Sequence, residues 1–412
     1  SAVDIAPDGT VVLAGSFPGY APSGVITRVL NDGTSGLVIR ADRDGSALRS
    51  ISRIGTRVND MEIGADGRII VCGDFGVAAL DAEADTVLWS ANPGEGRRCA
   101  VGTDGTVAFI ANGNAYVYNA VGDALKTWAI GGTTQDDITV DGASGLVLAG
   151  GYTQKNVAGQ CSGVLKVPYV RAWRYNGQLA WSAYDASAQQ AQSASQCADS
   201  RVQRLAIGRD GKLYLAGTTD GGNTAFARDP QNIATQLGNR QVKFDKYNDP
   251  YNLGPGTYTW FGRYDGAQGQ LLLGQFLLTR MDSNKGNSVG PRAISADADG
   301  TIYLAGEAYY KLANREAQRV GGLAVGEYEG GEAFVAVFTP DLKLRIRWTP
   351  LAGPAPSSAG GSPAVGIAVR DGRAAAALTF APKSGITRSL ITLNALQPAP
   401  SGANDGYLVV WK

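Results

Sequence analysis

The chain has 412 residues, and its 37 Lys and Arg balance 37 Asp and Glu, so its overall charge does not favour binding to nucleic acid or to an anionic membrane. No apolar run approaches the roughly 20 residues of a membrane-spanning helix, so no membrane span is expected. Histidine is absent, which excludes Ser-His-Asp and Cys-His nucleophiles and histidine-containing zinc sites.

A unit of two alternating strands around an Asp-Gly turn recurs seven times along the chain. It is clearest at residues 206–217, where the second strand ends in Ala-Gly, and its turns begin at Asp8, Asp66, Asp104, Asp141, Asp210, Asp299 and Asp371. Glycine accepts the positive φ of a tight hairpin turn without a Cβ clash. A lone hairpin cannot bury its faces, so the units must stack side by side.

Most units add a third and a fourth strand, and the fourth often carries a tryptophan. Trp89, Trp128, Trp181 and Trp348 occupy this place, where we expect them to pack between neighbouring units. The chain is therefore predicted to be all-β, a seven-bladed β-propeller forming a single domain. Its blades are expected at about 1–54, 58–91, 97–130, 135–184, 200–278, 289–350 and 363–412.

Long connections interrupt this regular spacing. Between the second and third strands of a blade they fall at residues 17–35, 153–167, 218–257, 307–332 and 381–405, and a further one, 185–200, joins two blades. In a propeller, both kinds of connection emerge on the same face. We therefore predict long insertions on one face, where loops on a rigid scaffold would bind a protein or a glycan.

The seventh blade differs from the others, because residues 407–412 read as its third strand and no fourth follows. Either this blade has three strands and an exposed edge, or the missing strand comes from elsewhere in the protein or from a partner. Self-assembly at the seam between blade seven and blade one follows as an expectation.

The last two units carry a recognisable pattern. Residues 330–341 read GGEAFVAVFTPD and are followed by Arg347-Trp348-Thr349, and residues 405–409 read DGYLV. This pattern resembles the bacterial β-propeller repeat family (SBBP-like repeats), although Glu332 stands where that family usually has Asp. The resemblance implies a secreted or surface-attached bacterial propeller and brings no catalytic residues.

A weaker resemblance, through residues 80–90 (LDAEADTVLWS), is to quinoprotein-type propellers. Those enzymes typically have eight blades and a calcium-bound quinone. Seven units and irregular tryptophan placement argue against that assignment.

Four cysteines form an even set. Cys161 and Cys197 lie in polar loops, where a disulfide between them is favoured, whereas Cys72 and Cys99 lie in apolar strands, where buried thiols are commoner than a second bridge. Either bridge would indicate an oxidising, extracellular or cell-surface location.

Carboxylates and aromatics supply the remaining candidates for a site. Calcium needs only oxygen ligands, and residues 42–45 and 297–300 have alternate carboxylates beside glycine, although ordinary turn chemistry explains them better. Five glutamates gather in or beside the blade-six insertion, where paired carboxylates could support glycoside hydrolysis, but a solvated acidic loop is the favoured interpretation. These five are Glu307, Glu316, Glu327, Glu329 and Glu332.

The blade-five insertion concentrates aromatic side chains, which suit stacking on sugar rings or on a protein partner. A private hydrophobic core under the loop is the slightly favoured alternative. The candidate binding residues are Phe244, Tyr247, Tyr251, Tyr258 and Trp260.

Together these observations favour a non-enzymatic, extracellular or cell-surface propeller that acts as a binding or structural module, either alone or within a larger assembly or filament. No catalytic residue and no resident metal is assigned. The alternatives are a lectin and a carbohydrate-active or quinone-dependent enzyme that uses the loop face.

Overall fold

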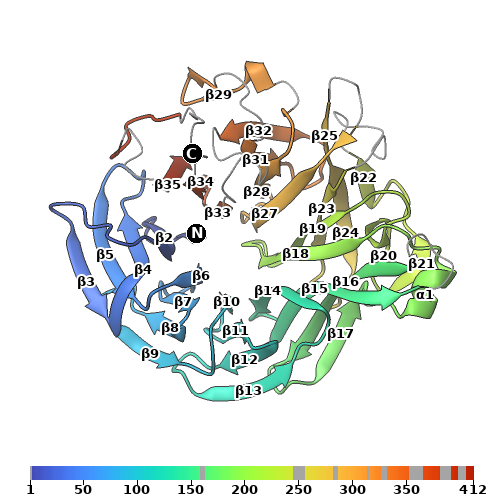
Figure 1. Cartoon of the computed structure of the whole chain (residues 1–412), viewed down its shortest axis with the longest axis horizontal. Coiled ribbons are helices and arrows are strands. Elements are labelled where there is room, and N and C mark those ends of the chain that lie inside the picture. The colour runs from blue at the N-terminus through green and yellow to red at the C-terminus, as the bar shows by residue number, and fades with distance from the viewer. Residues whose placement is uncertain are drawn as a thin grey trace.

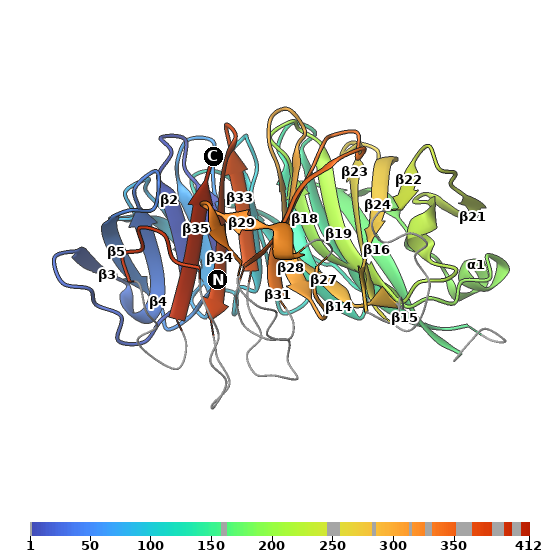
Figure 2. The same cartoon turned by 90° about the horizontal axis from the view of Figure 1, so that it is seen from above.

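The computed structural model describes residues 2–157, 163–244, 256–281, 286–312, 315–325, 332–351, 365–380, 391–397 and 405–412. Seven antiparallel sheets are arranged as blades around a central axis, so the predicted seven-bladed all-β propeller is confirmed (Figure 1). Seen from the side, the blades form a flat ring whose strands run across its thickness (Figure 2).

In each blade the first strand lies nearest the axis and the strands follow in order outward. Blades two, three and four have four strands each. These are β6 (Val58–Ile63), β7 (Ile69–Gly73), β8 (Gly76–Leu80) and β9 (Val87–Ala91); β10 (Arg98–Val101), β11 (Val107–Ala111), β12 (Asn114–Tyr118) and β13 (Ala124–Ala129); and β14 (Thr134–Asp141), β15 (Leu146–Asn156), β16 (Val164–Arg174) and β17 (Leu179–Ala183).

Blades one and five each add a fifth strand that their own insertion supplies. β3 pairs in parallel with the outermost antiparallel strand β5, and β22 does the same with β24. Blade one consists of β1 (Ala2–Ile5), β2 (Val11–Ser16), β4 (Asp32–Ala41), β5 (Leu48–Ile54) and β3 (Ile26–Leu30); blade five of β18 (Ser200–Ile207), β19 (Leu213–Thr219), β23 (Tyr258–Tyr264), β24 (Leu271–Leu277) and β22 (Val242–Phe244).

Blade six is a four-stranded sheet, and blade seven has three strands among the described residues. The strands are β27 (Val289–Ala296), β28 (Ile302–Ala308), β31 (Glu332–Phe338) and β32 (Arg345–Leu351) in blade six, and β33 (Val365–Arg370), β34 (Arg373–Phe380) and β35 (Asp405–Trp411) in blade seven. The expected three-stranded sheet is thus present, and within the described part of the chain no strand pairs with the outer edge of β35.

Short elements occupy the connections. They are α1 (Ala188–Ser193), the 3-10 turns η1 (Ala225–Ala227) and η2 (Arg315–Ala317), and three two-stranded ribbons, β20 (Arg228–Asp229) with β21 (Asn232–Gln236), β25 (Thr279–Arg280) with β26 (Gly286–Asn287), and β29 (Arg319–Val320) with β30 (Leu323–Ala324). Ser187 caps α1 by accepting a hydrogen bond from the backbone N–H of Gln190, and the Gln190 side-chain oxygen accepts one from the backbone N–H of Ser187.

The insertions emerge beside the starts of the innermost strands. Ser200 pairs with Thr219 and Val289 pairs with Ala308, so the end of each second strand lies next to the start of the first. The predicted placement of insertions on one face is confirmed. The insertion expected at 153–167 in blade four is instead partly strand, because β15 and β16 stay paired as far as Asn156 and Val164.

The ring closes by packing between blades seven and one. Val3 and Ile5 of β1 form one buried cluster with Ala375 and Ala377 of β34, and the Arg370 Nε donates to the Ile5 carbonyl at 2.8 Å. Hydrophobic layers of this kind fill the spaces between neighbouring blades around the ring.

The outer-strand tryptophans also pack between blades, as the sequence predicts. Trp89 and Trp181 donate their indole N–H groups to carbonyls of the next blade, Ala120 and Gly266, each at 3.2 Å. Trp128 lies against Trp173 of blade four, with ring centroids 5.8 Å apart. No helix in the described part of the chain is long and apolar enough to cross a membrane.

Candidate functional site

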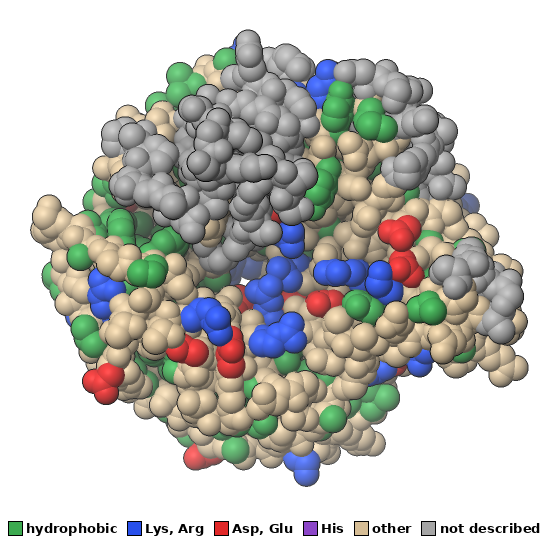
Figure 3. All heavy atoms as spheres, viewed as in Figure 1, with side chains coloured by type: hydrophobic (Ala, Val, Ile, Leu, Met, Phe, Trp, Pro, Cys, Tyr) green, Lys and Arg blue, Asp and Glu red, His purple; other side chains and the backbone are tan. Residues whose placement is uncertain are grey.

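A polar cavity of about 450 Å³ opens at the axis on the face that carries the insertions. Its wall is almost entirely charged or amide side chains, and Figure 3 shows blue Lys and Arg side chains gathered at the centre of this face. The charged and amide residues of the lining are Arg57, Asn59, Glu95, Arg97, Arg98, Asp136, Arg201, Gln203, Arg204 and Arg292. We call this cavity the axial pocket.

The innermost strands place these side chains by a repeated irregularity. In blades two, four, five and six, the first strand carries one extra residue relative to the second, and this residue lines the axial pocket. Such a bulge changes the direction of a side chain, here into the axial pocket, relative to the regular alternation of the strand. The four extra residues are Asn59, Asp136, Gln203 and Arg292.

A glycine of the second strand lies opposite each bulge. Gly73, Gly151, Gly217 and Gly306 pair with the residue just before the extra one. A Cβ on any of these glycines would overlap a carbonyl oxygen of the neighbouring first strand, so no side chain fits there without a shift. The glycines near the ends of the second strands, two of them in the recurrent Ala-Gly pair (Ala216-Gly217 and Ala305-Gly306), are therefore part of the construction of the axial pocket.

Beneath the pocket, carboxylates connect adjacent innermost strands. Asp60 accepts the backbone N–H of Cys99 at 3.3 Å, Glu62 that of Val101 at 3.0 Å, and Asp137 that of Leu205 at 2.8 Å. Burial raises the pKa of Asp137 to about 6, against the opposing effects of Arg98 and Arg204. Burial, together with the Asp4 carboxylate, raises the pKa of Glu62 to about 8.

Some of the pocket arginines are paired with carboxylates. Arg57 contacts Glu95 at 2.5 Å, and Arg292 contacts Glu307 at 3.1 Å. Arg98 lies between Asp60 at 3.6 Å and Asp137 at 3.8 Å. Burial lowers the pKa of Arg98, but these two carboxylates raise it above its ordinary value.

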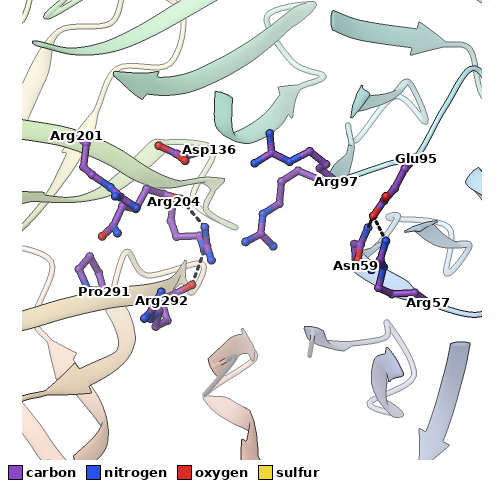
Figure 4. Close-up of a pocket in the computed structure, with 11 residues that line it drawn as sticks. Arg57, Asn59, Glu95, Arg97, Asp136, Arg201, Arg204, Pro291 and Arg292 are labelled. Carbon is purple, nitrogen blue, oxygen red and sulfur yellow. Dashed lines mark hydrogen bonds and ion pairs between the residues drawn. The ribbon is translucent and has the colours of Figure 1, made fainter. Parts of the chain in front are cut away.

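Three other arginines have no ion pair within the described residues: Arg97, Arg201 and Arg204. Arg204 donates to the backbone carbonyls of Arg292 and Gln203, as drawn in Figure 4 for the former. Burial and the nearby Arg98 guanidinium lower the pKa of Arg204 to about 10. The positive charge of Arg204 is therefore not fully balanced by neighbouring carboxylates.

The buried Nε atoms of Arg201 and Arg292, and the buried Oε1 of Gln203, also have no hydrogen-bond partner among the described residues. Buried polar atoms are ordinarily paired, because each unpaired one costs about 1–3 kcal/mol. These atoms are covered from solvent, so they mark incomplete hydrogen bonding within the pocket wall and are not themselves open to a ligand in the cavity.

This arrangement suits an anion with several oxygen atoms. A guanidinium offers donors in a planar fork that matches phosphate, sulfate and carboxylate oxygens. The axial pocket has no aromatic side chain in its lining, so it lacks the stacking surface that single-stranded nucleic acids use.

The aromatic site that the sequence suggests is wrong for two of its residues. Tyr258 and Trp260 are both 0% exposed. Trp260 stacks on Phe226, with centroids 5.7 Å apart, and donates to the Tyr264 hydroxyl at 2.9 Å. They belong to the blade-five core because both lie on strand β23 of that blade. Phe226 of the insertion packs on Trp260, as the interpretation of a hydrophobic core under the loop expects.

The other three aromatic candidates remain untested predictions. Phe244 ends the outer strand β22, and Tyr247 and Tyr251 lie outside the described residues.

The cysteine predictions have two outcomes. Cys72 and Cys99 are buried free thiols, so the suggested bridge between them is wrong; each packs in the apolar layer between blades two and three. Cys161 lies outside the described residues, and the Cys161–Cys197 disulfide stays a prediction.

The carboxylate candidates are largely engaged with arginines. Glu307 and Glu332 are buried and form ion pairs with Arg292 and Arg315. Glu327 and Glu329 lie outside the described residues, as does the side chain of Glu316. Within the described residues, no group of three or more carboxylates or thiols is placed to hold a metal ion.

The axial pocket itself is absent from the sequence predictions. The total charge is balanced, so composition gives no sign of an arginine cluster. The arginines of the pocket also come from separate blades, tens of positions apart in the chain. A signal was present: Arg57, Arg97, Arg98, Arg201 and Arg292 all fall at or just before the first strand of a repeat. When the repeats are aligned with one another, these arginines fall in the same part of the repeat.

Comparisons with known proteins show similarity of shape alone. No family model and no curated protein matches the sequence. A solved β-propeller domain of Cps50 (Swd1) from Myceliophteria thermophila is 10% identical, with 92% of each chain covered and a TM-score of 0.49. A protein of unknown function from Bacteroides caccae is 12% identical, with a TM-score of 0.39 over 82% of this chain and 93% of that one.

Proposed function

We propose that this propeller is a non-enzymatic binding module that captures an anionic ligand in the axial pocket. The observation that carries the proposal is the convergence of six arginines from four blades on one polar cavity, three of them without an ion pair in the described residues. The second strands of blades five and six end, and their insertions begin, beside the starts of the innermost strands that carry the pocket arginines. Loops on a rigid ring are well placed to adapt such a site to one partner.

Several observations make binding a better proposal than catalysis. The lining carboxylates, Glu95 and Asp136, are engaged by neighbours: Glu95 with Arg57 and Asn59, and Asp136 with the Thr134 hydroxyl at 2.8 Å. Guanidinium groups stay protonated at neutral pH and do not serve as general bases. The chain contains no histidine to take that role.

The test is thermal unfolding in the presence of sulfate, phosphate or acetate, at constant ionic strength made up with chloride. A ligand that binds only the folded state raises the melting temperature. We expect phosphate and sulfate to do so, and Arg97→Gln or Arg201→Gln to reduce the rise. Arg347→Gln, on the exposed outer strand β32, is the charge-matched control. An unchanged melting temperature with every anion would overturn the proposal.

The expected location is outside the cytoplasm or at a cell surface. The resemblance of the last two blades to secreted bacterial repeats and the predicted Cys161–Cys197 disulfide support it. Peptide mapping under non-reducing conditions tests the disulfide directly: recovery of Cys161 and Cys197 as separate free thiols from protein made in an oxidising compartment would remove this support.

Self-association through blade seven is a second proposal. The outer edge of β35 has no strand partner among the described residues, while blades one and five cover their outer edges with β3 and β22. An open edge can pair with a strand of another molecule. Sedimentation should then show oligomers that Val409→Pro abolishes, and a monomer at all concentrations would count against this proposal.

A further inference from the structure

The pocket arginines form two groups on opposite sides of the axis. Arg57, Arg97 and Arg98 come from blades two and three, and Arg201, Arg204 and Arg292 from blades five and six. In Figure 4, Arg97 and Arg57 lie on the side of the cavity opposite Arg201, Arg204 and Arg292, with Arg57 turned toward Glu95. Blade four, which lies between the two groups, contributes Asp136.

Each group has donors available for a ligand. In the first group, Arg97 is exposed and its side chain makes no hydrogen bond or ion pair with any described residue. In the second, Arg201 has no ion pair there and its buried Nε has no partner. Arg204 donates only to backbone carbonyls, which leaves its positive charge without a carboxylate contact in that part of the chain.

The size and composition of the cavity restrict what fits. A volume of about 450 Å³ is that of a small-molecule site, and a single phosphate or sulfate would occupy a small part of it. Pro291 is the one apolar side chain in the described lining, so an apolar ligand would bury little apolar surface there. Glu95 and Asp136 at the wall would repel a ligand whose negative charge is spread evenly along its length.

We propose that the axial pocket takes a compact hydrophilic ligand with two oxyanion groups, one held by each arginine group. This inference rests on the anion-binding function proposed above and specifies its ligand. Phosphate, sulfate and carboxylate share the chemistry that a guanidinium fork recognises. Gln203 also lines the cavity, and its amide is a neutral hydrogen-bonding group beside the second arginine group.

Calorimetric titration of the whole chain shows whether a ligand binds more tightly when it carries more than one anionic group. The probes are inorganic phosphate against propane-1,3-diol bisphosphate, and acetate against glutarate, so that the larger member of each pair has two oxyanion groups separated by a neutral linker. Because the second contact is intramolecular, we expect the larger member of at least one pair to bind about 100-fold more tightly than the smaller one. Which pair shows the larger ratio distinguishes a phosphate ligand from a carboxylate ligand.

Variants on the two sides of the pocket supply the second measurement. Arg97→Gln and Arg201→Gln should each weaken the tighter probe by about tenfold or more, since each removes one charged fork. The affinity for phosphate or acetate, which carry a single anionic group, should fall in only one of these two variants. Arg347→Gln should change neither, and circular dichroism confirms that each variant is folded.

The outcomes distinguish this inference from the function on which it rests. Equal affinities within both pairs overturn the two-group ligand and leave anion binding intact. Absence of binding by every probe overturns both. Tight binding of a glutamate-rich peptide, with weak binding of all four compact probes, overturns the compact ligand in favour of an acidic protein segment.

Discussion

The carboxylate of Asp137 accepts a hydrogen bond from the backbone N–H of Leu205, with Oδ2 and N 2.8 Å apart. The two residues lie on the innermost strands of blades four and five, 68 positions apart in the chain. Asp4 makes the same kind of contact with Ile63 at 2.9 Å, between blades one and two. Neighbouring blades are thus joined at the axis by buried carboxylates.

Replacing Asp137 with alanine should destabilise the protein. The substitution leaves the buried N–H of Leu205 without its acceptor and removes a carboxylate neighbour of Arg98, at a cost of about 1–3 kcal/mol. Urea unfolding at neutral pH measures the loss.

Two further variants test the cause. Asp137→Asn retains an oxygen acceptor and should lose less stability than Asp137→Ala. Asp136→Ala, one position away on the pocket wall, should change stability little; an equal loss from Asp136→Ala would contradict the role given to Asp137.

Glu62 should make stability depend on pH. Its pKa rises from 4.5 to about 8 on folding, so between these values the folded chain keeps a proton that the unfolded chain has released. The free energy of unfolding therefore falls as the pH rises through this window. The contribution of protonated Glu62 to stability is complete only below the window. The sign is opposite to that of a surface carboxylate in an ion pair.

The variant Glu62→Gln removes this titration while keeping an oxygen that can accept from the Val101 N–H. Wild type and variant should be similar near pH 4, and near pH 9 the variant should be more stable by on the order of 5 kcal/mol. Denaturation curves across this range check the prediction, and parallel pH profiles for the two proteins would refute it.

Gly217→Ala should damage both the fold and the axial pocket. A Cβ at this position overlaps the carbonyl oxygen of Arg201, so the bulge that positions Gln203 must shift. We expect a loss of stability of about 1–3 kcal/mol and weaker anion binding, measured by unfolding and by titration with phosphate. Gly290→Ala is the matched control, because a Cβ there meets nothing within 4 Å.

Trp260→Ala should act on stability and leave glycan binding unaffected. The side chain is enclosed by Phe226, Phe276 and Tyr264, and its removal from such a core typically costs about 3–5 kcal/mol. Thermal unfolding and a glycan array on the same samples give the comparison. A stable variant that has lost glycan binding would restore the surface role first assigned to this tryptophan.

Much of the fold can be predicted from local patterns. Asp-Gly turns between alternating strands encode each hairpin within a dozen residues, and seven copies indicate the ring. The outer-strand tryptophans and the side on which the insertions emerge follow from strand order alone. The aromatic residues were harder to place, since Tyr258 and Trp260 lie on an inner strand of blade five and not on its loop.

The sequence by itself determined the hairpins, their number and the face on which the long connections lie, because each of these depends on neighbours in the chain. Only the tertiary structure decided where the arginines meet. Residues such as Arg57 and Arg292 become neighbours of one cavity because closing the ring brings the starts of the innermost strands to the axis. The bulges that aim Asn59 and Gln203 into it depend on strand register, which forms only when the strands pair.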